Sequence, residues 1–413
     1  KLMKKKILLY IGLIIISINT ANGILFSIYS YVRQRININS ISPEETNICY
    51  ALQKKIEDYI DNFNSKISVN ILNNNGEFIV DINGKIPRIP ASNQKILSSA
   101  FSLDNLGPNY LLKTSLKEMS SGGLYFDASG DPDFDKRHLD ELLRGLNSKE
   151  FNTVNKLPIL ITRSKKNTWW PPSWSYSDRK EEYGAPITKY SIASNASTKA
   201  LNNPIDNFIN ELKTSLVRNN LSSKYFIKPV DNDFSVDFVS TIKSVNSAPL
   251  YILLNLVNSE SHNYTAEVVF RHSLNNWSHD FPNVKYTKWL KDQNFDSDDF
   301  IFADASGLSR ENRVTTYGLS QFLRRMQLSR YSDYYFSSFS ILGVRGSLKN
   351  VKAPINLKGR ILAKSGRLSN VRSISGIILD KEIIFSIIVN NKENSTNKII
   401  NILSIVDNTN NCT

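Results

Sequence analysis

Residues 360–389, RILAKSGRLSNVRSISGIILDKEIIFSIIV, contain the clearest structural signal in the chain. Apolar-rich runs at 360–364, 371–379 and 383–389 are separated by short polar segments. Short apolar runs bounded by turn residues predict strands. We therefore expect three successive strands here, followed by a last helix over about 395–406.

The first part of the chain predicts elements that match this end. Residues 48–63 have the pattern of an amphipathic helix, and apolar-rich runs at 67–72 and 77–82 flank NNNG at 73–76, a hairpin signature. Helical periodicity then covers 92–106, until Gly107-Pro108 ends it. One end of the chain therefore has a helix and a hairpin, and the other has strands and a helix. This arrangement indicates that the two ends build one sheet-and-helix domain.

The middle of the chain differs from both ends. From about residue 112 to residue 243 it has short alternating runs, many turn residues and a tryptophan cluster of Trp169, Trp170 and Trp174. We interpret this part as an insertion into the sheet-and-helix domain. Aromatic side chains pack in cores and between domains more often than they stack on sugars, so we expect the tryptophan cluster to be a packing feature.

The composition excludes several classes of protein. The chain has 413 residues, of which 41% are hydrophobic, so it is too long for one small module and too apolar for a disordered chain. Two cysteines and four histidines, without HExxH spacing, argue against a metal site, and we expect no metal or cofactor. The net charge of +13 suggests a polyanionic partner, but no basic patch interleaved with aromatics points to nucleic acid.

Residues 1–40 have the pattern of an export signal followed by a linker. A basic head at 4–6, an apolar run at 7–18 and small polar residues at 19–23 are typical of a signal peptide. A second apolar run at 24–32 leaves open an uncleaved anchor, hence membrane association through the N-terminus, and a buried core helix is a third alternative. The first two interpretations place the body of the protein outside the cytoplasm, where Cys49 and Cys412 could pair.

The first candidate for chemistry is Ser92-Asn93-Gln94-Lys95, at the start of the predicted helix over 92–106. Positions three apart share a helix face, so the Lys95 amine can reach the Ser92 hydroxyl. A serine becomes a good nucleophile only when a neighbouring base takes its proton, and a lysine can act as that base if its pKa is lowered by burial or a nearby cation. The pattern is weak alone, because it also occurs at Ser177, Ser240 and Ser395.

Two further motifs follow Ser92-x-x-Lys95 in a fixed order. Ser261-His262-Asn263 falls inside a helical stretch, and Lys364-Ser365-Gly366 falls on a predicted strand before the last helix. This ordered triple resembles the serine acyl-transferase arrangement of penicillin-binding proteins and serine β-lactamases. The separation of the first two motifs, 169 residues, is far more than one helical subdomain needs and fits a large insertion between them.

Short sequence segments (phrases) around the motifs narrow the resemblance to one family. They resemble the D-Ala-D-Ala carboxypeptidases of the peptidase S13 family, the penicillin-binding protein 4 type. They occur in family order over about residues 48–390. The phrases are PASNQK at 90–95 with LGP at 106–108, SGDP at 129–132, YGAP at 183–186, SAPL at 247–250, DASGLSR at 304–310 with NRV at 312–314, GVRGSL at 343–348 and AKSGRL at 363–368.

The resemblance implies an α+β fold of the penicillin-binding-protein and β-lactamase type, an antiparallel sheet flanked by helices with a large, mostly β insertion. We expect the catalytic domain at 41–112 plus 245–413 and the inserted part at 113–244. The implied activity is that of a serine DD-peptidase, which cleaves the D-Ala-D-Ala bond of peptidoglycan stem peptides through an acyl-enzyme and is acylated by β-lactams. Carboxypeptidase action is expected, and endopeptidase action on cross-links is left open.

The resemblance also implies a role for each catalytic motif residue. Ser92 is the nucleophile, and Lys95 is the base that activates it. Ser261 relays a proton to the leaving amine, and Asn263 orients Lys95 and the substrate amide. Lys364 adds positive potential that keeps Lys95 neutral and attracts the substrate carboxylate.

Substrate contacts are expected from the three residues that follow Lys364. Ser365 binds the terminal carboxylate, Gly366 leaves room for substrate backbone along the strand edge, and the Arg367 N–H joins that of Ser92 in an oxyanion hole. Arg367 departs from the small hydroxyl residue usual in the family, and Ser365 stands where threonine is commoner.

Two features near the motifs are given structural interpretations. His262 fills the variable middle position of the second motif, and we expect an outward-facing helix residue there. The segment from Asp304 to Asn312 is dense in Asp, Ser and Gly, which predicts a structural loop rather than catalytic residues.

Two alternatives to a DD-peptidase remain from the sequence. One is another enzyme on the same scaffold, a β-lactamase or esterase. The other is a catalytically idle peptidoglycan-binding scaffold protein, with Arg367 blocking the site.

Overall fold

The computed structural model describes residues 47–61, 66–146, 155–231, 235–278, 284–391 and 396–409. The signal or anchor predicted within residues 1–40 lies outside these ranges. Cys49 is disulfide-bonded, but Cys412, the partner that the sequence leaves open for it, lies outside the described residues. Within the described ranges, no helix has both the length and the apolar character that crossing a membrane requires.

A six-stranded sheet joins the two ends of the chain. The strand order is β10 (Ser340–Ile341), β11 (Ile361–Leu368), β12 (Val371–Ile378), β13 (Ile383–Val389), β1 (Ile67–Leu72) and β2 (Phe78–Ile82). All neighbours are antiparallel, and β1 pairs with β13 in the register Ile67 to Val389. The strands predicted from residues 67–82 and 360–389 are confirmed, as is the prediction that the two ends share a sheet.

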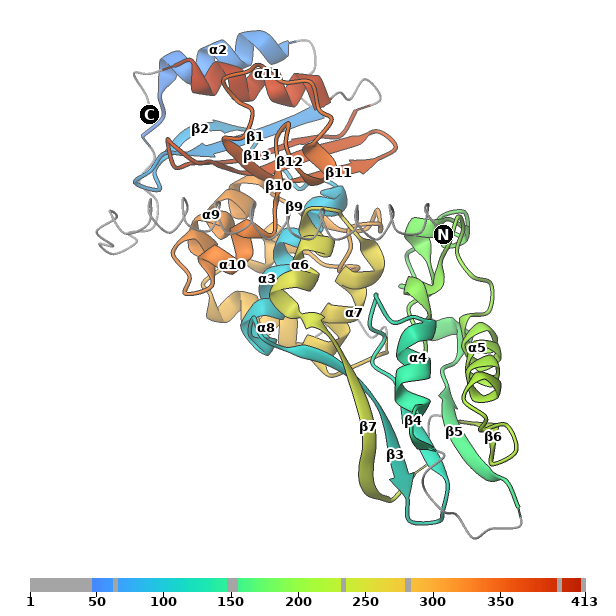
Figure 1. The fold of residues 1–413 in the computed structure, drawn as a ribbon. Helices are drawn as coiled ribbons and strands as arrows, with labels where there is room; N and C mark the ends of the chain where they lie inside the picture. Colours follow the sequence, from blue (N-terminus) through green and yellow to red (C-terminus); the bar gives the residue numbers. More distant parts are fainter. Residues whose placement is uncertain are drawn as a thin grey trace.

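Helices cover both faces of this sheet (Figure 1). On one face α2 (Tyr50–Ile60) and α11 (Thr396–Asp407) pack against each other and against the strands. On the other face, α9 (Thr316–Gln327) contacts β1, β12 and β13. Beyond α9 lie four more helices, α3 (Gln94–Leu106), α6 (Leu250–Asn258), α7 (Asn263–Leu274) and α10 (Ser332–Ser337).

Strand β13 is apolar at every position except Ser386, and its place in the fold explains this. Successive side chains of a strand point to opposite faces. Ile384 and Ile388 therefore join the core shared with α3 and α9, whereas Phe385 and Ile387 join the core under α2 and α11. All seven residues of β13 are buried. A strand between two helical layers must be apolar on both faces, which is the pattern of residues 383–389.

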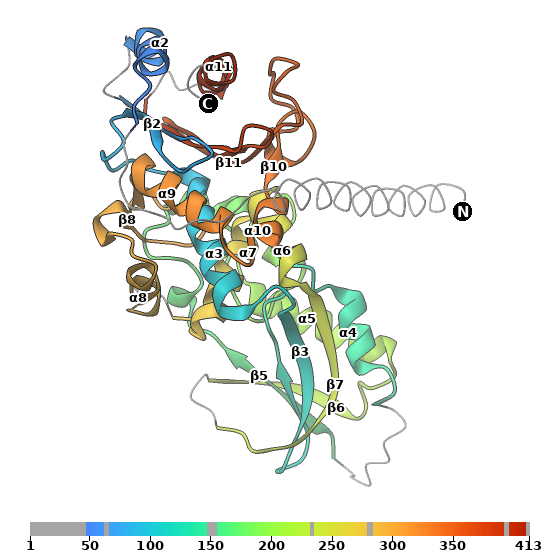
Figure 2. The ribbon, with the colours of Figure 1, turned by 90° about the vertical axis from the view of Figure 1, so that its left-hand side faces the viewer.

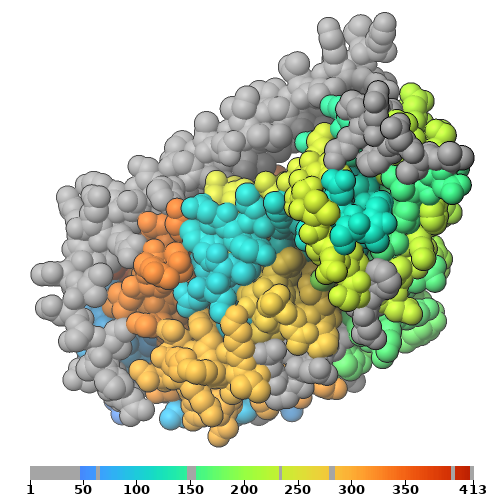
Figure 3. Space-filling view, turned by 90° about the horizontal axis from the view of Figure 1, so that it is seen from below, coloured from blue at the N-terminus to red at the C-terminus, as the bar shows by residue number. Residues whose placement is uncertain are grey.

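Helix α8 (Val284–Asp292) packs beside the end of α3, on the face seen from below (Figure 3). The Trp289 indole N–H donates a 3.0 Å hydrogen bond to Asp104, and its ring packs edge-on against Phe101 at 5.3 Å. A short two-stranded ladder, β8 (Phe300–Ile301) with β9 (Arg313–Val314), follows α8. These contacts hold α3, which carries the first motif at its start, within a rigid helical layer.

The middle of the chain forms a second sheet that extends away from the helices (Figures 1 and 2). Its order is β6 (Tyr225–Asp231), β5 (Leu157–Arg163), β4 (Leu124–Asp127), β3 (Leu111–Met119) and β7 (Phe238–Pro249). The chain leaves the helical layer in β3 and returns in β7, which pair antiparallel from Leu111 opposite Pro249. Entry and exit therefore lie side by side, the arrangement that an insertion needs.

The second sheet is not purely antiparallel. Strands β4, β5 and β6 run parallel, and α4 (Lys136–Leu143) and α5 (Pro204–Arg218) lie between them in sequence. Parallel neighbours need a long crossover, usually helical. Phe126, Phe208 and Leu212 are among the residues of a separate core beneath these helices. The tryptophan cluster packs as predicted, because Trp169 is 6% and Trp174 2% exposed.

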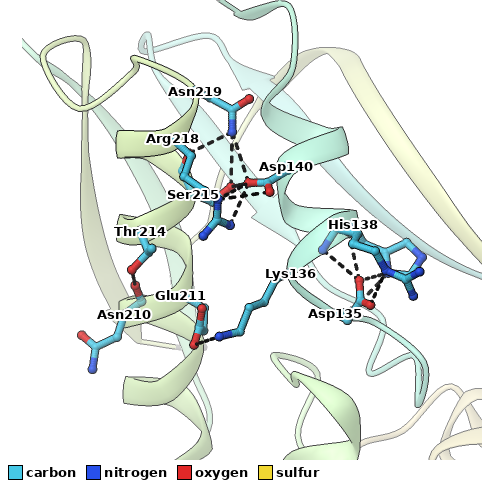
Figure 4. Close-up of polar contacts among 11 residues, drawn as sticks. Asp135, Lys136, His138, Asp140, Asn210, Glu211, Thr214, Ser215, Arg218 and Asn219 are labelled. Atoms are coloured by element: carbon cyan, nitrogen blue, oxygen red, sulfur yellow. Dashed lines mark hydrogen bonds and ion pairs between the residues drawn. The ribbon is translucent and has the colours of Figure 1, made fainter. Parts of the chain in front are cut away.

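Helices α4 and α5 are joined by polar contacts centred on Asp140 (Figure 4). The Asp140 carboxylate accepts hydrogen bonds from the Ser215 hydroxyl, the Arg218 guanidinium and the Asn219 amide. Burial acts to raise the pKa of Asp140, but the bonds from Arg218 and Ser215 and the Arg218 charge hold this pKa below its ordinary value. An exposed ion pair, Lys136 with Glu211, lies further along the same helices.

We predict that Asp140→Ala lowers the free energy of unfolding by about 1–3 kcal/mol, because it leaves the fully buried Ser215 hydroxyl without this acceptor. Lys136→Ala is the matched control and should have a smaller effect, because the Lys136 side chain is 59% exposed. The two urea unfolding midpoints provide the measurement. Equal midpoints would show that the Asp140 contacts do not stabilise the helix pair.

Candidate active site

Ser92 lies in a tight turn immediately before α3. Residues Ala91–Asn93 form a single 3₁₀ turn, and Ala91 has a positive φ of 48°. Such a conformation costs a residue other than glycine about 1–3 kcal/mol and persists only where the surroundings impose it. Here the Ser373 hydroxyl donates to the Pro90 carbonyl at 2.6 Å, and the Asn93 amide donates to the Lys364 carbonyl at 3.1 Å. The turn is therefore fixed to strands β11 and β12.

Gly366 allows β11 to approach this turn closely. A Cβ built on Gly366 would lie 2.8 Å from the Pro90 carbonyl oxygen and 2.9 Å from the Ser92 nitrogen. The predicted reason for the glycine, room for a substrate backbone, is thus incomplete, because its missing side chain also makes room for the chain's own turn at Ser92. A contact between Gly366 and substrate stays a prediction.

The Lys95 amine is enclosed by three acceptors. Its Nζ lies 3.2 Å from Ser92 Oγ, 2.6 Å from Asn263 Oδ1 and 2.5 Å from the Ser306 carbonyl oxygen. Asn263 Nδ2 donates to the Tyr183 carbonyl at 2.9 Å, which fixes its oxygen toward Lys95. Of the three partners, only the Ser92 hydroxyl can also donate. When Lys95 is neutral, its lone pair can therefore accept a proton from Ser92.

Burial sets the protonation state of Lys95. Its side chain is fully buried, and burial lowers its pKa to about 7, although the negative charges of Asp304 and Glu267 act in the opposite direction. A group with this pKa is neutral in a large fraction of molecules near neutral pH, which a general base requires. The sequence predicts both burial and a nearby cation as causes; in the structure, burial is the cause of the shift.

The Asp304 loop supports Lys95 from the side opposite Ser92. The prediction of a structural loop is confirmed, because the buried Asp304 carboxylate binds the loop together. Its oxygens accept hydrogen bonds of 2.7 Å from the N–H groups of Gly307, Ser309, Asn312 and Trp174. The loop also reaches the site itself, through the Ser306 carbonyl and the Asp304 charge, and this role is missed from the sequence. The dense run of Asp, Ser and Gly at 304–309 was the available signal.

Ser261 and Asn263 lie between α6 and α7. The expectation that the whole second motif falls inside a helix is wrong, because α7 begins at Asn263 and Ser261 occupies the preceding turn with a φ of 63°. Helical backbone at Ser261 would direct its hydroxyl along α7, whereas the left-handed turn brings it to Lys364 at 2.9 Å. The break between α6 and α7 thus connects the second motif to the third.

Lys364 is the second buried amine of the site. Its Nζ donates to Ser261 Oγ at 2.9 Å and to the Ser365 carbonyl at 2.7 Å. Burial first, and the charge of Lys95 second, hold the pKa of Lys364 well below its ordinary value. The hydroxyl of Ser365 lies 2.6 Å from that of Ser347, within the GVRGSL phrase, and Arg367 is exposed on β11.

The expected outward position of His262 is wrong. The residue precedes α7 directly, and its Nδ1 lies 2.7 Å from the Thr265 hydroxyl. Burial, followed by the charge of Lys95, lowers the pKa of His262 to about 4. The imidazole is therefore neutral near pH 7. A continuous helix through 261–263 would have faced it outward, but the left-handed turn at Ser261 redirects the chain.

The middle of the chain, which forms the second sheet, contributes two residues to the site. Tyr183, whose carbonyl holds Asn263, belongs to a 3₁₀ turn at Glu182–Gly184. Trp174, whose indole binds Asp304, precedes that turn. No group of three or more His, Cys, Asp or Glu side chains in the described parts of the chain is placed to hold a metal ion.

Comparisons with known proteins identify the family of this chain. A model of the D-Ala-D-Ala carboxypeptidase 3 (S13) family matches residues 51–215 and 200–409. The chain belongs to this family. A search of curated proteins finds no match. The predicted family is therefore confirmed, and with it the enzyme class, a serine-type D-Ala-D-Ala carboxypeptidase.

Solved structures show the same fold. The structure of penicillin-binding protein 4 from Haemophilus influenzae has a TM-score of 0.72 at 17% identity and covers 86% of this chain and 98% of its own. Its complex with a β-lactam has a TM-score of 0.67 at 19% identity with the same coverage. A predatory peptidoglycan endopeptidase from Bdellovibrio bacteriovorus has a TM-score of 0.53 at 18% identity, covering 83% and 92%. The predicted α+β fold of the penicillin-binding-protein type is confirmed.

We predict that Lys95 loses its proton with a pKa of about 7, because burial disfavours its charged form. The measurement is the pH dependence of lysine ¹³Cε resonances in protein labelled with ¹³C-lysine. Lys95→Gln identifies the resonance by its disappearance. A Lys95 signal that stays in the ammonium position up to pH 9 would contradict the burial argument.

Proposed function

We propose that Ser92 and Lys95 carry out acyl transfer on the D-Ala-D-Ala end of peptidoglycan stem peptides. The observation that supports this most is the enclosed Lys95 amine, whose one proton-donating partner is the Ser92 hydroxyl. Neutral Lys95 takes the hydroxyl proton while Ser92 Oγ bonds to the carbonyl carbon of the penultimate D-Ala. The C–N bond to the terminal D-Ala then breaks, and water hydrolyses the ester to regenerate Ser92.

The leaving amine needs a proton, and Ser261 is placed to deliver it. Its hydroxyl gives its proton to the amine nitrogen as the C–N bond breaks and regains one from the Lys364 ammonium, 2.9 Å away. Lys364 is then reprotonated from solvent or from the Lys95 ammonium formed in the first step. Asn263 holds Lys95 in line with Ser92 throughout.

Strand β11, which carries the third motif, Lys364-Ser365-Gly366, binds the substrate. Lys364 and the Ser365 hydroxyl attract the terminal carboxylate of the substrate, and Arg367 lies exposed further along β11. The close approach of Gly366 to the Ser92 turn supports an oxyanion hole formed by the N–H groups of Ser92 and Arg367. The exposed position of Arg367 argues against the idle-scaffold alternative, in which this side chain blocks the site.

The setting of the reaction is part of the proposal. A family that acts on peptidoglycan works outside the cytoplasm, and residues 1–40 provide an export signal or anchor, with membrane association in the second case. A penicillin-binding protein 4 structure contains a β-lactam, which supports acylation of Ser92 by β-lactams. The peptidoglycan endopeptidase likeness supports cleavage of cross-links as a second activity. The pairing of β3 with β7 supports an inserted domain at 113–244.

We predict that Ser92→Ala abolishes labelling by a fluorescent penicillin and reduces D-Ala release from a D-Ala-D-Ala pentapeptide by about ten-thousandfold or more. The control is Ser240→Ala, a change in another Ser-x-x-Lys match on β7, which should leave both signals unchanged. Labelling that persists in Ser92→Ala would contradict the assignment of the nucleophile. Fast turnover of the penicillin, without a stable adduct, would favour the β-lactamase alternative.

We also predict that Trp174→Phe slows acylation by about three- to tenfold, because it removes the indole donor that binds Asp304 beside Lys95. Trp169→Phe is the matched control. It has the same change in size at a buried site, its lost hydrogen bond is to Ser164, and the Trp169 ring packs in the other core. The second-order rate constant for penicillin labelling measures both. Equal rates in the two variants would show that the inserted part does not act on the site through Trp174.

A further inference from the structure

Glu267 is a buried carboxylate that the proposed mechanism does not use. It lies on α7, one turn after Asn263, and is fully buried. Its Oε1 accepts hydrogen bonds from the backbone N–H groups of Ala305 at 3.0 Å and Ser306 at 2.9 Å. Its Oε2 is buried and has no hydrogen-bond partner among the residues that the structure describes. A buried carboxylate oxygen without a partner is costly, so its retention needs a reason.

The contacts of Ser306 connect this carboxylate to the proposed base. The N–H of Ser306 is held by Glu267, and the carbonyl of the same residue accepts the 2.5 Å hydrogen bond from Lys95 Nζ. Glu267 and Asn263 therefore reach Lys95 from one helix, Asn263 directly and Glu267 through one residue of the Asp304 loop. A shift of the carboxylate would move the carbonyl that fixes the amine.

We propose that Glu267 is the positioning residue of the Ser92–Lys95 pair: it fixes the Ser306 carbonyl against the Lys95 amine, and its charge determines at which pH Lys95 becomes a free base. This inference rests on the proposed function of Ser92 and Lys95. Glu267 acts on the Ser92–Lys95 pair through Ser306 and through its charge, rather than through a hydrogen bond of its own to Ser92 or Lys95.

The charges around Glu267 decide the sign of its effect. Burial first, and the neighbouring Asp304 carboxylate second, raise the pKa of Glu267 to about 7, with Arg271 on the next turn of α7 acting against them. Lys95 loses its proton in the same range, and the two groups interact, so the apparent pKa values belong to the pair. The other charged or titratable groups near this pair are Lys364, His262 and Tyr264.

The direction of the effect follows from this arrangement. A negative charge on Glu267 favours the ammonium form of Lys95 and raises its pKa. Removal of that charge lets Lys95 become neutral at lower pH. Acylation requires neutral Lys95, so the part of its rising limb in which Glu267 is ionised must move to lower pH when Glu267 is replaced by an uncharged residue.

The test compares Glu267→Gln with Glu267→Ala in the full chain. The glutamine keeps an oxygen for the Ala305 and Ser306 N–H groups but has no charge. The upper part of the acid limb of the penicillin acylation profile, where Glu267 is ionised in the parent, should therefore move to lower pH by roughly a few tenths of a pH unit, while the plateau changes little. Well below pH 7 Glu267 is protonated in the parent as well, so the two profiles should converge there. The alanine removes the acceptor as well, and its plateau should fall by about tenfold or more.

Three results separate the possible outcomes. A rising limb in Glu267→Gln that coincides with that of the parent at every pH would overturn the effect of the Glu267 charge on Lys95. An unchanged plateau in Glu267→Ala would overturn the positioning role. The ¹³Cε titration of Lys95 in Glu267→Gln is a readout that does not depend on catalysis, and an unshifted titration would refute the inference about Glu267. Absence of acylation in the parent protein would instead refute the proposed function.

Discussion

The burial of the Lys95 amine is the constraint on which the rest of the site depends. An ammonium without water must be surrounded by acceptors, and here Ser92, Asn263 and the Ser306 carbonyl supply them from three separate segments. The same loss of water brings the pKa of Lys95 to about 7. One physical fact therefore both assembles the site and gives the lysine the character of a base.

Excluding water from the Lys95 amine requires rigid elements on every side of it. The strained turn at Ala91 is held by Ser373 and by the carbonyl of Lys364, and Gly366 lets the strand lie directly against it. The Asp304 loop closes the opposite side, and its carboxylate is bound by backbone N–H groups and by Trp174. The long middle segment is thus joined to the chemistry, since Trp174 and Tyr183 both come from it.

Several parts of this structure could be predicted from short-range patterns. The strand at 383–389 and the hairpin at 67–82 are long apolar runs bounded by turns, and their boundaries agree within a residue or two. The Ser92-x-x-Lys95 contact follows from helical spacing. The helical placement predicted for Ser261 and the outward position predicted for His262 were wrong, because a left-handed residue at 261 interrupts the helical pattern. The turn is held by contacts with residues outside it, such as that of Ser261 with Lys364 and that of the His262 N–H with the Leu256 carbonyl.

The sequence by itself determined the family, the apolar strands of the central sheet and the three motifs, because each depends on residues close together in the chain or in a fixed order. Only the tertiary structure decided what surrounds Lys95. Asp304, Glu267 and Trp174 are separated from it by about 80 to 210 positions, and in the sequence they look like ordinary turn, helix and core residues. Their effect comes from charge and hydrogen bonding in a space without water, and such a space exists only once α3, α7 and the loop have packed together.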